Sequence, residues 1–312
     1  MGCTGSWAFA AGVVIQEIKR YIISPAVDIL LFYDKALSEN DRQLLEGMGC
    51  TLLPFQDESA QMPKSVMDVF SPLSLTKFVC FDLLDFYKTV VWLDLDLVVQ
   101  DDISPLFSFG PFSIAKEDSF FYENPEKASA AINGYDLPGL DPSRPNYNSG
   151  VLVFSNELPS YRSLHARCIN YINAYAAHIR YPDQAAFNML VQSMPDLVTE
   201  LPTSYNAHPK NPESVFATIV HTHGAYKIWN DGLMLACFSE WQRDYARWLG
   251  MGGSAYTGPV ENSSYAASSP FSVFAQFFTT LEKGNICIER LQKELEIKDQ
   301  VIAKLTRLLE KK

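Results

Sequence analysis

The chain has 312 residues, of which 47 % are hydrophobic and 20 % are charged, and its formal net charge at pH 7 is −11. This composition fits a soluble globular protein with a sizeable core, and the acidic balance leaves no basic stripe for nucleic-acid phosphates, which excludes a nucleic-acid-binding role. The six scattered cysteines form no C-x-x-C pair, which argues against a disulfide framework or structural zinc and indicates a reducing cytoplasm. No apolar run reaches the roughly 18 residues that a transmembrane helix requires.

Residues 1 to about 250 alternate short β-branched or aromatic runs with helical stretches, a pattern typical of an α/β fold with a mostly parallel sheet. Apolar runs predict strands at residues 27–33, 89–95 and 151–154. A helix is predicted from Ser38 to Met48, with Ser38 as its N-cap and Gly49 just past its end. A second helix is predicted over residues 73–86.

The C-terminal part of the chain differs in texture from the rest. Residues 251–280 begin with a Gly-, Ser- and Pro-rich stretch that predicts a linker between a 1–250 domain and a tail at 281–312. Residues in the tail follow an alternating spacing of three and four, with Lys298 at the one polar position and apolar residues at the others: Ile288, Leu291, Leu295, Ile302, Leu305 and Leu309. This spacing predicts a short coiled coil that joins copies of the chain into a dimer or trimer. The alternative is one amphipathic helix folded onto its own domain.

Two carboxylates, Asp94 and Asp96, end the apolar run at residues 90–93. In regular strand geometry both point to one face, at the sheet edge where α/β folds bind ligands. Two anions this close repel one another unless a cation lies between them, and hard oxygen ligands suit Mg²⁺ or Mn²⁺. One alternative is a surface pair that closes a strand. Another is the nucleophile motif of haloacid-dehalogenase-like (HAD-like) phosphatases, which needs a second acidic pair on a later strand.

Four segments in order carry a more specific pattern. They are residues 76–107 around Lys77 and the D-x-D, residues 146–151 (NYNSGV), residues 182–188 (PDQAAFN), and residues 221–229 (HTHGAYKIW). Together they resemble the glycogenin-like retaining glycosyltransferases of family 8, over residues 4 to about 230. The resemblance implies a GT-A fold, which is a Rossmann-like nucleotide-diphospho-sugar transferase domain.

The resemblance also implies site roles. Asp94, Asp96 and His221 would hold Mn²⁺ or Mg²⁺, and Lys227 would supply a cation to the leaving diphosphate. Asp183 and Gln184 would lie beneath the anomeric carbon as catalytic residues. The residues implied to contact the nucleotide-sugar are Thr4, Gly5, Ser6, Phe9, Lys77, Asp94, Leu95, Asp96, Asn148, Ser149, Gly224 and Lys227.

The N-terminal match is looser than the others. Residues 4–12 look like the family loop that holds the uracil, with Ser6 in place of the usual Asn and Phe9 in place of the Tyr that stacks on the base. Family members carry an apolar strand ahead of this loop, whereas only Met1, Gly2 and Cys3 precede it here. We therefore expect a truncated or misassigned start.

The implied reaction is transfer of a hexose from a UDP-sugar, with glucose or galactose as the expected sugar, to a glycan or other hydroxyl acceptor. The divalent cation acts as a Lewis acid on the leaving UDP. Retention of the anomeric configuration follows from the resemblance alone. The competing interpretation is a non-catalytic, transferase-like scaffold presented by the coiled coil, and a HAD-like phosphatase is the remaining alternative.

Overall fold

The computed structural model describes residues 1–22, 27–55, 71–117, 140–141, 144–176, 179, 181–224 and 227–260, without the side chains of residues 212, 233 and 236. The predicted coiled coil at 281–312 and the linker beyond residue 260 lie outside the described residues. Within those residues, no helix has the length and apolar character needed to cross a membrane.

The first sheet is parallel, as predicted. Its strands are β1 (Gly2–Cys3), β2 (Ile29–Tyr33) and β3 (Cys50–Pro54), in that spatial order. Helix α1 (Ala8–Tyr21) links β1 to β2, and α2 (Glu39–Gly47) links β2 to β3. The Ser38 side chain accepts a hydrogen bond from Asp41 N at 3.1 Å, and Gly49 has φ +76°, so both predicted ends of this helix are confirmed.

The second sheet is mixed rather than mostly parallel. It contains β4 (Thr89–Leu93), β6 (Phe112–Lys116), β7 (Tyr147–Ser155) and β8 (Val198–Leu201), in the order β4-β7-β6-β8. β7 is antiparallel to both β4 and β6, whereas β6 and β8 are parallel. β5 (Leu97–Val99) and β9 (Ile219–His221) form a separate short antiparallel pair. Since a strand buried on both faces shows the same apolar run in either direction, the sequence pattern did not reveal these orientations.

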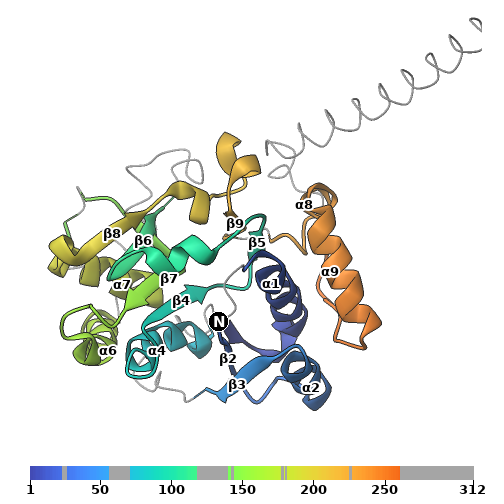
Figure 1. Cartoon of the computed structure of the whole chain (residues 1–312), viewed down its shortest axis with the longest axis horizontal. Coiled ribbons are helices and arrows are strands. Elements are labelled where there is room, and N and C mark those ends of the chain that lie inside the picture. The colour runs from blue at the N-terminus through green and yellow to red at the C-terminus, as the bar shows by residue number, and fades with distance from the viewer. Residues whose placement is uncertain are drawn as a thin grey trace, which may run out of the picture.

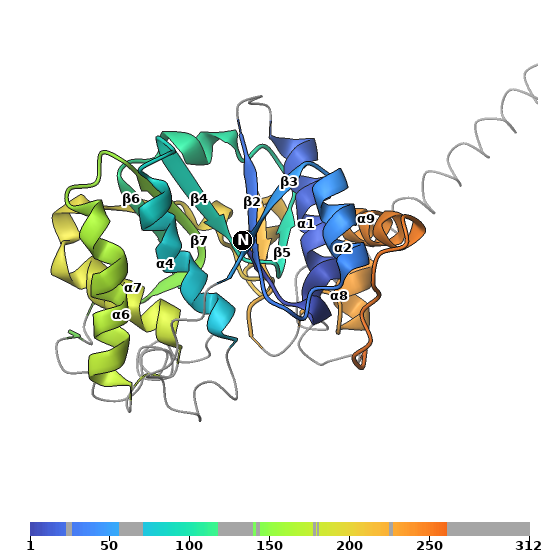
Figure 2. The same cartoon turned by 90° about the horizontal axis from the view of Figure 1, so that it is seen from below.

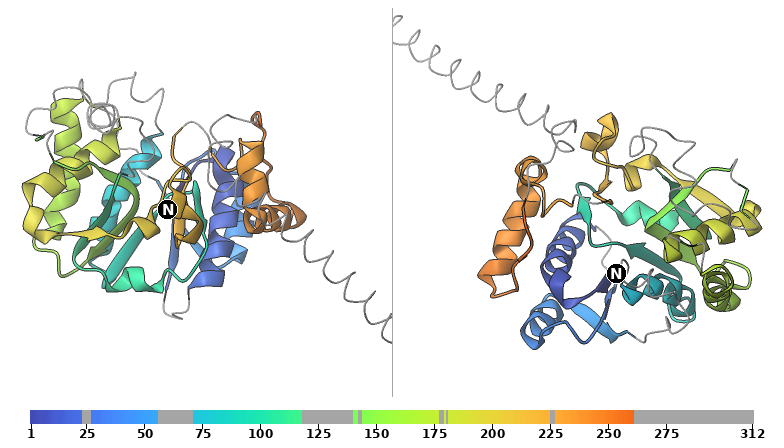
Figure 3. Two further views of the ribbon diagram at one scale, coloured as in Figure 1. Left: turned by 90° about the horizontal axis from the view of Figure 1, so that it is seen from above. Right: turned by 180° about the vertical axis from the view of Figure 1, so that it is seen from behind.

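The other α-helices in the described part of the chain are α4 (Thr76–Leu83), α6 (Leu164–Tyr175), α7 (Pro182–Ser193), α8 (Gly232–Cys237) and α9 (Ser239–Gly250). The predicted helix at residues 73–86 is divided into a 3₁₀ turn (Pro72–Leu75) and α4. α1, α2, α8 and α9 gather on one side of the molecule, and α4, α6 and α7 gather on the other (Figures 1 and 2). Figure 3 shows the same division from above and from behind.

Strand β7 separates two apolar cores. Val151 and Val153 pack into the core that contains α1 and α9, while Leu152 and Phe154 pack into the core that contains α4, α6 and α7. This alternation follows from the two-residue period of a strand. Because both faces of β7 are buried, its position is tightly constrained, and the polar residues at its start are held between the two halves.

Next to the short strand β1, β2 and β4 face one another across a cavity of about 360 Å³. Its walls include Met1, Leu30, Val90 and Trp92. The N-terminal amine of Met1 is buried here and donates to Leu30 O at 3.3 Å. Burial lowers the pKa of this amine below its usual value.

Candidate active site

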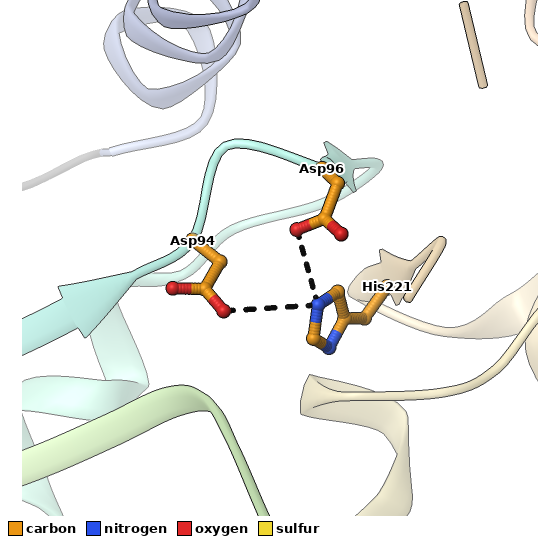
Figure 4. A group of neighbouring side chains, drawn as sticks. All are labelled: Asp94, Asp96 and His221. Carbon is orange, nitrogen blue, oxygen red and sulfur yellow. Dashed lines mark hydrogen bonds and ion pairs between the residues drawn. The ribbon is translucent and has the colours of Figure 1, made fainter. Parts of the chain in front are cut away.

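Asp94 and Asp96 lie in the turn between β4 and β5, not in a continuous strand. Asp94 N donates to Gly150 O on β7 at 2.9 Å, and Asp96 O accepts from Thr222 N at 2.8 Å, just past β9. The turn is therefore held from two sides. The prediction that regular strand geometry aligns the two carboxylates is wrong; the turn brings them together instead, with both pointing toward His221 (Figure 4).

His221 completes the group from the end of β9. Its Nε2 lies 3.2 Å from Asp96 Oδ1 and 3.9 Å from Asp94 Oδ2, and one ligand atom of each residue lies within 4.8 Å of the others. When Mg²⁺ binds about 2.1 Å from each ligand atom, two ligand atoms can be at most roughly 4.2 Å apart. Small side-chain shifts are therefore enough to bring these three residues to binding distance of one cation. Two carboxylate oxygens and one imidazole nitrogen can hold a divalent cation, and the carboxylates favour Mn²⁺ or Mg²⁺.

Asp94 is oriented by two neighbours, Trp92 and Lys77. Trp92 Nε1 donates to Asp94 Oδ1 at 2.7 Å, whereas Lys77 Nζ lies 3.0 Å from Oδ1 and 3.1 Å from Oδ2. The oxygen without the Trp92 hydrogen bond, Oδ2, is the one nearer His221. Trp92 lies on β4 and Lys77 on α4, so these two elements fix the carboxylate of Asp94 in the turn that follows β4.

Two lysines offset the negative charge of the acidic residues. Lys77 Nζ also lies 2.7 Å from Asp183 Oδ2. Burial alone would lower the pKa of Lys77, but the carboxylates of Asp183 and Asp94 raise it above its usual value. Lys227 Nζ contacts Asp96 Oδ2. Burial would raise the pKa of Asp96, yet Lys227 and His221 together hold it well below its usual value. Asp96 is therefore a buried anion.

A second cluster of polar residues lies beside the first, around Glu117. Ser149 Oγ donates to Asp183 Oδ2 at 2.9 Å. Glu117, just after β6, accepts from Asn148 Nδ2 at 3.1 Å and from Gln184 Nε2 at 3.2 Å, and its Oε1 lies 3.1 Å from His223 Nε2. Strand β7 and the start of α7 thus present hydroxyl, amide and carboxylate groups to the same space, the kind of set that binds sugar hydroxyls.

His208 and His223 pack against each other, with ring centroids 4.7 Å apart. Burial, followed by the nearby His221, lowers the pKa of His208 to about 2. Burial and the neighbouring histidines likewise hold the pKa of His223 well below its usual value. Both imidazoles are neutral at physiological pH, so the contact between His223 Nε2 and Glu117 Oε1 adds no positive charge to the site.

The metal-ligand candidates, the two lysines and the polar residues around Glu117 line one cavity of about 680 Å³. The predicted site residues that line it are Thr4, Lys77, Asp94, Leu95, Asp96, Asn148, Ser149, Asp183, Gln184, His221, Gly224 and Lys227. The wall also includes Trp7, Glu117 and His223. Gly224 has φ +100°, a backbone conformation that favours glycine.

Three of the predicted nucleotide contacts, Gly5, Ser6 and Phe9, are not on the cavity wall. Phe9 is 1 % exposed and lies in an aromatic cluster with Trp229 and Tyr245, at centroid distances of 5.3 and 5.7 Å. Its ring is used for core packing, so it is not available to stack on a base. At Gly5, a Cβ would stand 1.9 Å from Ala36 O, so the glycine is required by backbone packing.

Sequence reasoning missed Glu117, Asn206 and His223 as site residues. His223 lies within the segment at residues 221–229 that carries the family resemblance, so its position was visible although its role was not. Glu117 follows β6 without any motif, and only the fold brings it to Asn148 and Gln184. Asn206 Oδ1 lies 2.9 Å from His221 Nδ1, behind the proposed metal ligands.

Comparisons with known proteins agree with this geometry. The sequence profile described as Glycosyl transferase family 8 matches residues 1–233. A comparison with curated protein sequences found no match.

Solved structures show a similar fold. The galactosyltransferase LgtC, in complex with donor and acceptor sugar analogs, has a TM-score of 0.60 and 14 % identity over 80 % of this chain and 98 % of its own. The bifunctional glycosyltransferase WbbM (apo structure) has a TM-score of 0.58 and 17 % identity over 80 % of this chain and 50 % of its own. GlyE of Streptococcus pneumoniae TIGR4 has a TM-score of 0.52 and 16 % identity over 84 % of this chain and 65 % of its own. At these identities the likeness is one of fold.

Proposed function

Because this chain belongs to glycosyl transferase family 8, we propose that it transfers a hexose from a UDP-sugar to a hydroxyl group of a glycan or similar acceptor, with retention of configuration. The observation that carries the proposal is the convergence of Asp94, Asp96 and His221 with Lys77 and Lys227 on one cavity of about 680 Å³. That volume lies within the range of about 300–1,000 Å³ for ligand sites. The non-catalytic scaffold loses support, since all five polar groups are present and lie together.

Asp94, Asp96 and His221 are the proposed ligands of Mn²⁺ or Mg²⁺. When bound, such an ion supplies positive charge that stabilises the leaving diphosphate. The chain prepares the ligands in advance: Trp92 and Lys77 orient Asp94, and the contact with Lys227 keeps Asp96 ionised. Preorganised charge of this kind lowers the barrier because little reorganisation remains at the moment of reaction.

Lys227 is the proposed partner of the leaving group. Its Nζ contacts Asp96 Oδ2, and its side chain is 18 % exposed, so the ammonium lies at the cavity surface. From this position it can donate to a diphosphate oxygen as negative charge develops there. Gly224, three residues earlier, lets the backbone approach the same phosphates.

Asp183 is proposed to face the anomeric carbon of the donor sugar. Lys77 and Ser149 hold its Oδ2 at 2.7 and 2.9 Å, which fixes the position of the carboxylate. An anion in this place can stabilise the positive charge that develops on the sugar ring, or form a transient bond to it. Gln184 follows on the first turn of α7 and is proposed to contact the sugar hydroxyls. On the nucleotide side, we propose Trp7 rather than Phe9 as the ring beside the base.

A thermal-shift screen across UDP-sugars, with and without Mn²⁺, tests this function. One UDP-hexose should raise the melting temperature in the presence of Mn²⁺ and have little effect in excess chelator. Nucleoside diphosphates with other bases serve as controls. Equal stabilisation by every nucleotide, independent of metal, would contradict the proposal.

We also propose, from the sequence pattern, that the catalytic domain spans residues 1–250 and that residues 281–312 join copies of the chain.

A further inference from the structure

A line of buried polar side chains leads away from His221, on the side opposite the two aspartates. His221 Nδ1 lies 2.9 Å from Asn206 Oδ1, and Asn206 Nδ2 lies 3.0 Å from Asn148 Oδ1. Asn148 Nδ2 in turn lies 3.1 Å from Glu117 Oε2. Asn206 and Asn148 are 2 % and 4 % exposed, so water cannot readily replace these hydrogen bonds.

The direction of these hydrogen bonds follows from their two fixed ends. Gly150 N, a backbone donor, lies 2.9 Å from Asn148 Oδ1, so the oxygen of this amide must face it. The NH₂ group of Asn148 therefore points to Glu117, whose carboxylate accepts. Because Asn148 Oδ1 can only accept, Asn206 must turn its own NH₂ toward it and its oxygen toward His221.

The consequence reaches the proposed metal ligand. Since Asn206 Oδ1 accepts, His221 must carry a proton on Nδ1, so Nε2 is the ring nitrogen whose lone pair can bind a cation. That is the nitrogen that faces Asp96 and Asp94, at 3.2 and 3.9 Å. We propose that Glu117, Asn148 and Asn206 form a directional hydrogen-bond relay that fixes His221 in the Nδ1–H tautomer and keeps Nε2 ready to bind a divalent cation.

The residues of this relay are positioning residues, because they act through His221. A free neutral imidazole exchanges its proton between both nitrogens, so an unsupported His221 would spend part of its time with Nε2 protonated and unable to ligate. Mutation of a neighbour that orients a histidine ligand commonly lowers metal affinity about 10- to 100-fold. Asn148 uses three of its four hydrogen-bonding positions within the protein, so one N–H is left for the donor sugar.

The relay also joins the metal half of the cavity to its sugar half. Glu117 accepts from Gln184 Nε2 at 3.2 Å and lies 3.1 Å from His223 Nε2, as well as binding Asn148. The Glu117 carboxylate thus supports two amides. One is Asn148, which orients Asn206 and through it His221, and the other is Gln184, which is proposed to contact the sugar. Only the binding of a cation by Nε2 rests on the proposed function. The proton on Nδ1 of His221 can be measured in the absence of any metal.

The test reads the tautomer directly in the full-length, metal-free protein. Nitrogen-15 NMR of the imidazole groups at pH 8 distinguishes Nδ1–H from Nε2–H, and His221→Asn assigns the signal. The wild type should show Nδ1–H at His221. A wild-type His221 without a proton on Nδ1 would overturn the relay without the need for any variant.

Variants then test each link. Asn206→Leu removes the acceptor and should shift His221 toward Nε2–H and weaken Mn²⁺ binding, measured by titration with UDP present, about 10- to 100-fold. Glu117→Leu should have a smaller effect in the same direction. Asn206→Asp supplies a carboxylate directly to Nδ1, so Glu117→Leu should no longer change the tautomer in that background. Glu200→Leu is the matched control, since Glu200 pairs with Lys116 at the surface and should leave both readings unchanged.

The outcomes separate this inference from the proposed function. A wild-type tautomer in both Asn206→Leu and Glu117→Leu would overturn the relay. If the leucine variants do not fold, the wild-type tautomer and the Asn206→Asp variant, in which Nδ1–H must persist, still decide the question. A fixed Nδ1–H tautomer with no Mn²⁺ binding by the wild type would support the relay and contradict the proposed metal site.

Discussion

Gly150 lies directly against the imidazole of His221, so closely that a Cβ at this position would stand 2.1 Å from His221 Cε1 and 2.4 Å from Nδ1. The glycine is therefore required by the side chain from β9 that packs onto β7. Any other residue here must displace the ring from its position beside Asp96.

Gly150→Ala is expected to weaken Mn²⁺ binding by at least about 10-fold, because it displaces a proposed ligand and its neighbour Asn206. Isothermal titration of Mn²⁺ in the presence of UDP measures the effect. Gly110→Ala is the matched control, since a Cβ at Gly110 would meet nothing within 4 Å. Unchanged affinity in Gly150→Ala would show that His221 does not bind the cation from this position.

Lys227→Met is expected to lower kcat about 10²- to 10³-fold, because it removes a charge that acts mainly as the diphosphate leaves. Affinity for Mn²⁺ should change far less. Steady-state kinetics with the UDP-hexose found by the screen separate these effects. Lys116→Met, which alters an exposed lysine paired with Glu200, serves as control. A raised KM with unchanged kcat would move Lys227 from transition-state stabilisation to ground-state binding.

Asp183→Asn should reduce sugar transfer at least about 100-fold while leaving UDP and Mn²⁺ binding close to normal. The amide keeps the shape of the side chain but removes the negative charge that Lys77 stabilises at 2.7 Å. Activity and UDP binding are measured on the same preparation. Retained transfer activity would exclude Asp183 from the chemistry.

The sequence predicted the residues whose chemistry is visible in a short motif. Asp94 and Asp96 interrupt an apolar run, and His221 and Lys227 are spaced within one segment, so their types and order could be recognised and the fold does bring them together. Glu117 has no such motif, because its role depends on partners from β7, α7 and the segment after β9.

Phe9 is a residue that matches a motif but has a different role in the structure. An aromatic residue at a loop–helix junction suits both a nucleotide base and a core, and the choice depends on residues more than 200 positions later. Trp229, Tyr245 and Tyr256 surround it, with centroids within 5.7 Å. The direction of β7 was equally hidden, since burial on both faces removes the alternation that a half-buried strand displays.

We expect the free energy of unfolding to depend on pH because of His208. Burial lowers the pKa of this residue to about 2, whereas an unfolded histidine titrates near 6.5. Below pH 6.5 the unfolded chain therefore binds a proton that folded His208 does not, so the free energy of unfolding falls as the pH falls, by up to about 1.4 kcal/mol per pH unit. Asp96, whose folded pKa is lowered, loses its contribution only as the pH falls below about 3.8, outside this window.

Urea unfolding between pH 7.5 and 4.5 measures this slope. His208→Asn keeps an acceptor for Lys210 N, which lies 3.2 Å from His208 Nδ1, and should reduce the slope by up to about 1.4 kcal/mol per pH unit. The same slope in the wild type and the variant would show that His208 takes up a proton in the folded protein.

The most direct test of the account is release of UDP from a UDP-hexose by the purified full-length protein, measured for the wild type and Asp96→Asn with Mn²⁺ and in excess chelator. Asp96→Asn preserves the shape of a buried side chain but removes the anion shared by His221 and Lys227. We predict UDP release by the wild type with Mn²⁺, its loss in chelator and recovery on restoring Mn²⁺, and at least about 100-fold lower release by Asp96→Asn. Full activity in excess chelator, or in Asp96→Asn, would contradict the metal-dependent mechanism.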